Sequence, residues 1–371
     1  MSREVVTNSK RVVIKIGSST LTGSAGHELD DSAVDALVQV VSNLRGRGTE
    51  VVLVSSGAIA AGLAPLGLKV RPKDLATQQA VASVGQGRLI ASYNRAFDSH
   101  NIIASQVLLT IDDVVRRSHY QNAQRTLFRL IQMDVVPIIN ENDSVGVSEI
   151  RFGDNDRLAA LVSHLIGADL LVLVTDVDGL YDAPPSHIGA KRISDVPDVS
   201  QLRDIEIGGV GSSGVGSGGM VTKIEAARIA TGAGVNMLLT TLADLPSALT
   251  GADLGTVFHA RTDRKPSRLL WLAHAATPHG KLVMDSGATT AIKERGTSLL
   301  AAGVVAVEGE FLAGDTVELV SPHQEVVARG LVAFDSSEIP AMLGKSTKQL
   351  AQELGPEYER ELVHRDDLVL L

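Results

Sequence analysis

Two lysines, one in a buried strand and one at the start of a helix, occupy positions that suggest chemistry. Lys15 interrupts the aliphatic run Val12–Ile16, where a lysine is costly unless its amine reaches water or an anion. Lys223 ends the glycine-rich stretch Gly208–Lys223 and lies in the first turn of the helix predicted to follow it. Glycines let the backbone approach a ligand, and the unpaired N–H groups at a helix start favour anions. These features favour a phosphate-binding site; the alternatives are a flexible surface loop and an edge-strand lysine that reaches solvent.

The glycine-rich stretch also contains the spacing of a dinucleotide-binding fingerprint, beginning at Gly209 and again at Gly214. That fingerprint requires a preceding buried strand and an acidic residue about 20 positions later. The preceding residues, QLRDIEI, are not those of a buried strand, while Glu225 is too near and Asp244 too far. The sequence therefore disfavours a Rossmann-type site.

Short polar segments follow three of the predicted buried strands. They are Ser56 after Glu50–Val54, Asn140–Asp143 after Val135–Ile139, and Thr175–Asp176 after the run Asp169–Val174. Ligands of doubly wound sheets bind at the carboxyl ends of the strands, so we expect these segments to line one site. Asn and Asp also favour ordinary turns, which is the alternative for residues 140–143.

Three polar residues, Asp154, Asn155 and Asp156, open another predicted helix, Arg157–Ile166. One such residue is enough to cap a helix N-terminus. Three in a row therefore favour a functional role over capping alone.

The elements that would position these residues alternate between strand and helix. Aliphatic runs are separated by helical patterns, including 73–97 and 119–133, as is typical of an α/β protein. A change in composition around 260–278 predicts two domains, 1–260 and 278–371, joined by a linker at 261–277. The second domain has short strand signals separated by glycines and only one or two helices, which predicts a small β-rich barrel.

Composition excludes several classes of site. The chain has 371 residues and no cysteine, which removes disulfides, thiolate metal ligands and cysteine nucleophiles. Its start lacks an apolar core of signal-peptide length, and no run approaches the ~18 apolar residues of a membrane span. We therefore expect a cytoplasmic protein without membrane contact. The net charge of −9 disfavours a wide nucleic-acid surface.

The ordered motifs resemble those of the amino acid kinase family, and in particular of its members that phosphorylate free glutamate. They are VVIKIGSS, VSSGAIAAG, INENDSV, GDNDRLAALVS, TDVDGLY and GSGGMVTK. The C-terminal segment GATTAIKERGTSLLAAGVVAVEGEF resembles a PUA domain. The resemblance covers nearly the whole chain. It implies a three-layer αβα sandwich with a mainly parallel sheet, followed by a PUA-like barrel.

The resemblance also implies an activity: Mg²⁺-dependent transfer of the γ-phosphoryl group of ATP to the side-chain carboxylate of L-glutamate. The product would be L-glutamyl 5-phosphate, in the first step of proline biosynthesis. Feedback inhibition by proline, a homo-oligomer and functional coupling to the reductase that consumes the product are further implications. The Mg²⁺ ion is expected on the phosphates of ATP, with no metal site formed by the protein alone.

Matching the motifs residue by residue assigns roles to individual positions. The implied catalytic residues are Lys15, Lys223 and Asp156, where Asp156 organises the two lysines. The implied substrate-binding residues are Ser56, Asp143, Asp154 and Asn155. The implied ATP-binding residues are Lys15, Thr175, Asp176, Ser217, Gly218, Gly219, Met220, Val221, Thr222 and Lys223. Ser217 departs from the threonine often found in the family, but the hydroxyl is retained.

Two alternatives remain open at this level. The acceptor could be that of another family member, namely N-acetylglutamate, aspartate, carbamate or UMP. The PUA-like domain could bind RNA, since PUA domains elsewhere do. From residue 275 onward, however, 8 Lys and Arg stand against 15 Asp and Glu, a net charge of −7. Phosphate contacts require a basic surface, so a structural or regulatory role is favoured for this domain.

Overall fold

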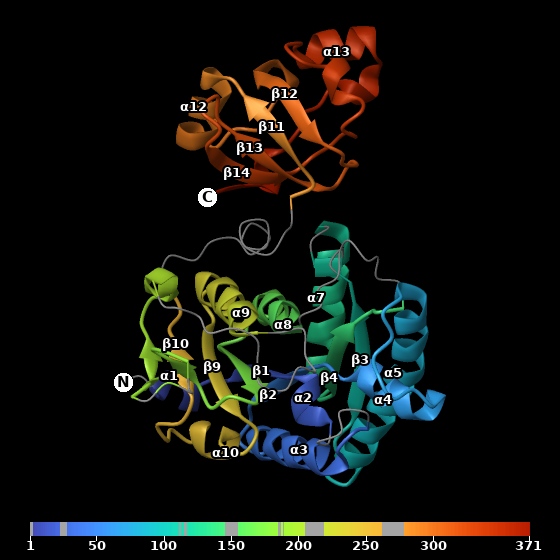
Figure 1. Cartoon of the computed structure of the whole chain (residues 1–371), viewed down its shortest axis with the longest axis vertical. Helices are drawn as coiled ribbons and strands as arrows, with labels where there is room; N and C mark the ends of the chain where they lie inside the picture. The colour runs from blue at the N-terminus through green and yellow to red at the C-terminus, as the bar shows by residue number, and fades with distance from the viewer. Residues whose placement is uncertain are drawn as a thin grey trace. The chain divides into compact units, whose positions relative to one another are not determined.

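The computed structural model describes residues 3–22, 28–110, 113–114, 117–144, 155–184, 187, 189–204, 219–261 and 278–371 (Figure 1). The chain divides into two compact units, Met1–Arg264 and Lys265–Leu371. Most of the predicted linker 261–277 lies outside the described residues, so the predicted domain boundaries stay a prediction.

Eight of the described strands in the first unit form one sheet, in the order β3-β4-β2-β1-β5-β9-β10-β8. The first six of these run parallel, β10 is antiparallel to β9, and β8 is parallel to β10. The strands are β1 (Arg11–Ile16), β2 (Glu50–Ser55), β3 (Ala104–Leu109), β4 (Val136–Glu141), β5 (Leu170–Thr175), β8 (Asp195–Val196), β9 (Asn236–Thr241) and β10 (Thr256–Phe258). A separate hairpin pairs β6 (Leu180–Tyr181) with β7 (Arg192–Ile193).

Helices cover both faces of this sheet. Figure 1 shows α8 and α9 together on one side of the sheet and α3 and α10 on the other. The helices of this unit are α1 (Glu4–Thr7), α2 (Ser18–Leu21), α3 (Asp31–Arg45), α4 (Ala58–Leu63), α5 (Leu75–Asp98), α7 (Arg117–Gln132), α8 (Asn155–Leu165), α9 (Met220–Gly232) and α10 (Leu245–Ala248), with 3-10 turns Ala64–Leu66 and Val199–Asp204. The predicted αβα sandwich with a mainly parallel sheet is confirmed.

The alternation of side chains along β1 decides which residue faces which helical layer. Ile14 and Ile16 pack in one apolar cluster with Leu37 and Val41 of α3. Successive side chains of a strand point to opposite faces. Lys15 therefore points to the other face, which α8 covers.

The predicted end of the strand Val135–Ile139 is wrong. The sequence predicts a strand that ends at Ile139 and a polar loop from Asn140, but β4 continues to Glu141. The cause is β3, an edge strand that the sequence pattern did not predict; it pairs with β4 as far as Leu109 opposite Glu141. Asn140 is therefore a buried strand residue, 2% exposed.

The second unit contains a five-stranded sheet in the order β12-β11-β13-β14-β15, so the predicted β-rich fold is confirmed. Its pairs are antiparallel except for β11 with β13. The elements are β11 (Gly280–Met284), α12 (Ser286–Arg295), β12 (Val304–Gly309), β13 (Thr316–Val320), β14 (Val326–Leu331), α13 (Thr347–Glu353) and β15 (Leu368–Leu370), with 3-10 turns Ala301–Gly303, Ile339–Ala341, Pro356–Tyr358 and Arg365–Asp367. Leu282, Leu319 and Ala328 from three of these strands belong to one apolar core.

Within the parts of the chain that the structure describes, no helix is long and apolar enough to cross a lipid bilayer.

Candidate active site

The site is built on β1, which lies between β2 and β5 in the middle of the sheet. Lys15 is the residue before the last of this strand, and its backbone neighbours are Val54 on β2 and Leu173 on β5. A charged residue in the centre of a parallel sheet must be paired, because a buried unpaired charge is costly. Lys15 is only 7% exposed, so its amine has to find a partner inside the protein.

That partner is Asp156, the second residue of α8, which also contacts Lys223 of α9. The Nζ atom of Lys15 lies 2.5 Å from Asp156 Oδ1, and Nζ of Lys223 lies 3.3 Å from Oδ2. The side chain of Asp156 is 1% exposed, and each lysine side chain is 9% exposed. The hydroxyl of Thr222 lies 3.3 Å from the same Oδ2 atom. The structure thus brings all three predicted catalytic residues into one buried cluster, here called the lysine triad.

The charge state of the lysine triad follows from two opposing effects on Asp156. Burial alone would raise the pKa of this carboxyl group, but the two neighbouring ammonium groups outweigh it and hold the pKa well below its usual range. A carboxylate in the first turn of a helix is also favoured by the helix dipole. Asp156 is therefore ionised throughout the physiological range.

A second ion pair aligns the two helices that carry this cluster. Arg157, next to Asp156 on α8, donates from Nε to Glu225 Oε2 on α9 at 2.8 Å. The pair is about three-quarters buried, so it fixes α8 against α9 in the register that brings Asp156 to Lys223. Helix α9 begins after Gly219, and among the residues that the structure describes no side chain caps its N-terminus. Its first N–H groups are consequently available to an anion.

On the other side of the lysine triad, Asn155 connects the ends of β2 and β4. Its Nδ2 group donates to Ser56 Oγ at 2.8 Å and to Asn140 Oδ1 at 3.0 Å. Asn140 in turn donates to Gln86 Oε1 at 2.8 Å. The Oδ1 atom of Asn155 is buried and accepts no hydrogen bond from the residues described. The predicted substrate residues Ser56 and Asn155 are thus in direct contact, with an acceptor atom left for a ligand.

Ser56 is held by the sharp turn between β2 and α4. Its N–H group donates to the carbonyl of Ile16 at 3.1 Å. The next residue, Gly57, has φ of 107°, a left-handed conformation that favours glycine. Helix α4 then crosses α5 so closely that a Cβ atom on Gly85 would lie 1.7 Å from the carbonyl oxygen of Ala58. This contact leaves α4, and with it Ser56, little room to shift.

The remaining predicted residues occupy the same edge of the sheet where the structure describes them. Thr175 ends β5 and donates to the exposed Asp176 at 3.0 Å. Asp143 lies two residues beyond β4. Gly219 directly precedes α9, and Met220 to Lys223 form the first turn of this helix. The predicted residues Asp154, Ser217 and Gly218 lie outside the described residues.

In the sequence analysis, Asn140 appears only as part of the polar segment Asn140–Asp143, with no role of its own, and Gln86 is not selected at all. Asn140 directly follows an aliphatic run, as the rest of its polar segment does, and this position is the feature of the sequence that could have identified it as a site residue. Gln86 lies within the long helix α5, and nothing in its surroundings in the sequence distinguishes it from a surface glutamine.

Among the residues described, no group of three or more His, Asp and Glu side chains could hold a metal ion. The carboxylate of Asp156 is already engaged by both lysines.

Comparison with known proteins gives a consistent picture. Residues 10–240 match the model of the amino acid kinase family, and residues 280–354 match that of the PUA domain. The chain is 59% identical over its full length to a protein named glutamate 5-kinase from Streptomyces avermitilis, covering 99% of that protein. It is 58% identical, again over its full length, to a glutamate 5-kinase from Salinispora arenicola, covering 100% of it. A carbamate kinase from Giardia lamblia, solved with AMP-PNP bound, matches 69% of this chain and all of its own with a TM-score of 0.52 at 19% identity.

Proposed function

We propose that this chain, which belongs to the amino acid kinase family, transfers the γ-phosphoryl group of ATP to the side-chain carboxylate of L-glutamate, the glutamate 5-kinase activity for which its relatives are named. The product would be L-glutamyl 5-phosphate, in the first step of proline biosynthesis. The observation that carries the proposal is the buried pairing of Asp156 with Lys15 and Lys223 at the ligand-binding edge of the sheet.

The acceptor needs no general base in this reaction. A glutamate side chain has a pKa near ~4.3, so its carboxylate is already ionised at neutral pH. The obstacle is instead that one anion must attack another. Positioning and charge neutralisation therefore carry the catalysis, and positively charged groups at the transferred phosphoryl group are what the chemistry requires.

The lysine triad supplies those groups. Lys15 and Lys223 contact opposite oxygens of Asp156, so two ammonium groups are held close together in a buried environment. Electrostatic interactions are stronger there than in water. Asp156 fixes both amines before the substrates bind, so little reorganisation is needed when negative charge develops on the phosphoryl oxygens.

ATP would bind across the ends of β5 and α9. The uncapped N-terminus of α9 at Gly219 and Met220 offers backbone N–H groups to the phosphates, together with the predicted Ser217 and Gly218. Thr175 and Asp176 would bind the nucleotide at the end of β5. Mg²⁺, carried by the phosphates of ATP, neutralises part of their charge when it is bound.

L-Glutamate would bind on the side of Ser56 and Asn155. The Oδ1 atom of Asn155, which accepts no hydrogen bond from the described residues, and the carboxylate of Asp143, with the predicted Asp154, suit the α-ammonium group. The hydroxyl of Ser56 and nearby backbone N–H groups suit the α-carboxylate. Because Asn155 and Asp156 are consecutive, this arrangement sets the acceptor beside the two lysines.

The test is a hydroxamate assay, in which hydroxylamine traps an acyl phosphate, with the purified full chain. Formation of the hydroxamate should require glutamate, ATP and Mg²⁺ together. The same assay and ADP release should be run with N-acetylglutamate, aspartate, carbamate and UMP as acceptors. Turnover of one of these without turnover of glutamate would reject the proposed acceptor but keep the phosphotransferase.

The finer assignments rest on the same resemblance. We infer that proline, the end product, inhibits the enzyme, that the protein is a homo-oligomer in the cytoplasm, and that the reductase consuming the labile acyl phosphate works in functional coupling with it. Adding proline to the hydroxamate assay tests the first of these. RNA binding by the second unit is disfavoured by its net charge of −7 from residue 275 onward.

A further inference from the structure

The segment that follows the predicted nucleotide residues Thr175 and Asp176 leads directly into the hairpin β6–β7. Leu180, the first residue of β6, is only four residues beyond Asp176 along the chain, a span of at most ~14 Å. Gly179 and Leu180 are buried, whereas Asp176 and Asp178 are exposed. The segment between Asp176 and Leu180 is therefore held at one end by β5 and at the other end by the hairpin.

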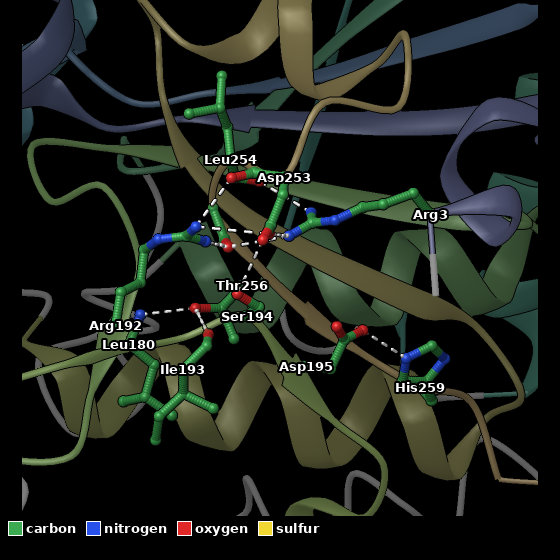
Figure 2. Close-up of polar contacts among 11 residues, drawn as sticks. Arg3, Leu180, Arg192, Ile193, Ser194, Asp195, Asp253, Leu254, Thr256 and His259 are labelled. Atoms are coloured by element: carbon green, nitrogen blue, oxygen red, sulfur yellow. Dashed lines mark hydrogen bonds and ion pairs between the residues drawn. The ribbon is translucent and has the colours of Figure 1, made fainter. Parts of the chain in front are cut away.

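One buried hydroxyl provides that anchor. Thr256, the first residue of β10, is fully buried, and its Oγ1 atom accepts a hydrogen bond from the N–H group of Leu180 at 2.8 Å. The same hydroxyl donates to the carbonyl of Ile193 at 2.6 Å (Figure 2). Leu180 and Ile193 are paired across the hairpin, so Thr256 holds both strands at one point. A Cβ atom on Gly179 would lie 2.9 Å from this hydroxyl, so the hairpin packs directly against it.

The turn that precedes Thr256 is itself held by two arginines, as Figure 2 shows. Arg192 of β7 donates to the carbonyls of Gly255 and Asp253, the second at 2.8 Å. Arg3, from the N-terminal segment, donates to the carbonyl of Leu254 at 2.8 Å and to the Asp253 carboxylate at 2.7 Å. Gly255 has φ of 75°, and a Cβ atom there would lie 2.4 Å from the carbonyl oxygen of Leu239. The turn therefore has one conformation, which presents Thr256 to the hairpin.

We propose that Thr256 and Arg192 are positioning residues for the nucleotide: they fix the segment 176–181, and through it Asp176, at the end of β5. They act through the backbone and touch neither substrate. The hydroxyl of Thr256 bonds one donor and one acceptor of the hairpin backbone, and removing a hydrogen-bond partner from a buried polar group is costly. Its loss would release the hairpin from β10 and leave Asp176 free to occupy positions that do not match ATP.

This inference rests on the proposed function, since it assumes that the end of β5 binds ATP. It makes a prediction that a purely structural role does not make. Ser56 follows β2 and Asn155 begins α8, and neither residue contacts Thr256 or Arg192 in any hydrogen bond described. The binding of ATP should therefore weaken selectively, while the binding of glutamate stays unchanged.

The experiment compares Thr256→Val, which keeps the shape but removes the hydroxyl, with Thr256→Ser, which keeps the hydroxyl. Calorimetric titration of the full chain with a non-hydrolysable ATP analogue measures binding without turnover, and steady-state assays give both KM values. For Thr256→Val we expect Kd and KM for the nucleotide to rise about tenfold, equivalent to about 1.4 kcal/mol. The KM for glutamate should change less than twofold, and Thr256→Ser should bind the nucleotide as the unsubstituted chain does.

The matched control is Thr231→Val in α9. Thr231 is also fully buried, and its hydroxyl donates to the carbonyl of Ala227 within the same helix. This variant should keep both KM values. Should Thr256→Val fail to fold, Arg192→Met tests the positioning role instead, because the side chain of Arg192 is more exposed. We expect the nucleotide Kd of this variant to rise about threefold.

The outcomes separate the two proposals. If the unsubstituted chain does not bind the nucleotide, the proposed function fails. In the other failing case, the unsubstituted chain binds the nucleotide, but Thr256→Val or Arg192→Met binds it equally well or loses affinity for ATP and glutamate in parallel. Either result rejects the positioning role and leaves the proposed function standing.

Discussion

Two carboxylates in the first unit each lie between two cations, but one group is buried and the other is exposed. The buried group is the lysine triad of Asp156 with Lys15 and Lys223, and the exposed group, here called the arginine triad, is Asp253 with Arg3 and Arg192. The side chain of Asp156 is 1% exposed and that of Asp253 is 68% exposed. The two groups share a charge pattern, so the difference between them isolates the effect of environment and of hydrogen-bonding partners.

The cations of the two groups also differ in what they bind. In the lysine triad both ammonium groups contact the carboxylate. In the arginine triad the guanidinium groups spread their donors over the carbonyls of residues 253 to 255 as well as over the Asp253 carboxylate. A guanidinium has several donors in a fixed plane, which suits the organisation of a turn, whereas an ammonium is a point charge. The arginine triad therefore holds backbone in place, and the lysine triad concentrates charge.

Because it is buried, the lysine triad is expected to add little to the free energy of unfolding. Taking three charges out of water is costly, and replacing a buried ion pair by apolar groups of similar size is often neutral or stabilising. A protein that keeps such a group at the carboxyl edge of its central strands has a reason other than folding. Charge neutralisation of a phosphoryl group is the reason proposed for it above.

The largest expected effect is that of Asp156→Asn. This change leaves two ammonium groups buried without their counter-ion, so we expect the free energy of unfolding to fall by about 3–5 kcal/mol and activity to be lost. Denaturant unfolding of the purified chain, followed by fluorescence or circular dichroism, measures the first effect.

A triple variant provides the sharper comparison. Lys15→Met, Asp156→Asn and Lys223→Met together remove every charge of the lysine triad while keeping the side chains long or isosteric. We expect this variant to recover most of the stability lost by Asp156→Asn but none of the activity. A triple variant as unstable as the single one would show that the lysine triad holds the fold together.

The next largest effect is that of Lys223→Ala on turnover. If the ammonium group neutralises charge in the transition state, kcat should fall about 100-fold, equivalent to about 2.7 kcal/mol, while the KM values change little. The hydroxamate assay under saturating and limiting substrate measures both constants. Lys15→Ala should behave in the same way. A variant with near-normal kcat and only a raised KM would mean that the lysine binds substrate and transition state equally.

These two lysines could be selected from the sequence because each stands where its residue type is unexpected. Lys15 lies in an aliphatic run, and Lys223 follows glycines at a helix start. Their common contact with Asp156 could not be derived in the same way, since it depends on the order of strands in the sheet and on the register of α8 against α9. The family resemblance supplied that relation, and the geometry of the described residues agrees with it.

The arginine triad and the edge strands had no comparable signal. The strand β3 reads ASQVLL, and it escaped prediction because an edge strand is only partly buried and lacks a continuous aliphatic run. Arg3 and Arg192 bind backbone carbonyls, which every residue has, so no pattern of residue types identifies their partners. Thr256 likewise looks like an ordinary strand threonine in the sequence, because its contacts with the hairpin are visible only in the folded structure.

A small effect is expected for Asp253→Asn. The carboxylate is exposed, and ion pairs at the surface contribute only about 0–1 kcal/mol because water and salt screen them. The carbonyl contacts of both arginines are left in place by this change. The free energy of unfolding should therefore fall by less than about 1 kcal/mol, and the difference should shrink further at high salt. A loss as large as that of Asp156→Asn would contradict the contrast between the two groups.

The smallest effect is expected from pH. The folded pKa of Asp156 lies well below its ordinary value of 3.8, because the two ammonium groups outweigh the effect of burial. Stability from a depressed pKa is fully present above the unfolded pKa and is lost only as the pH falls towards the folded one. Between pH 7 and pH 5, the difference in unfolding free energy between the unsubstituted chain and Asp156→Asn should stay constant. It should begin to shrink only below about pH 4. A difference that already shrinks between pH 7 and pH 5 would mean that Asp156 gains a proton in that range, which the pairing with both lysines does not allow.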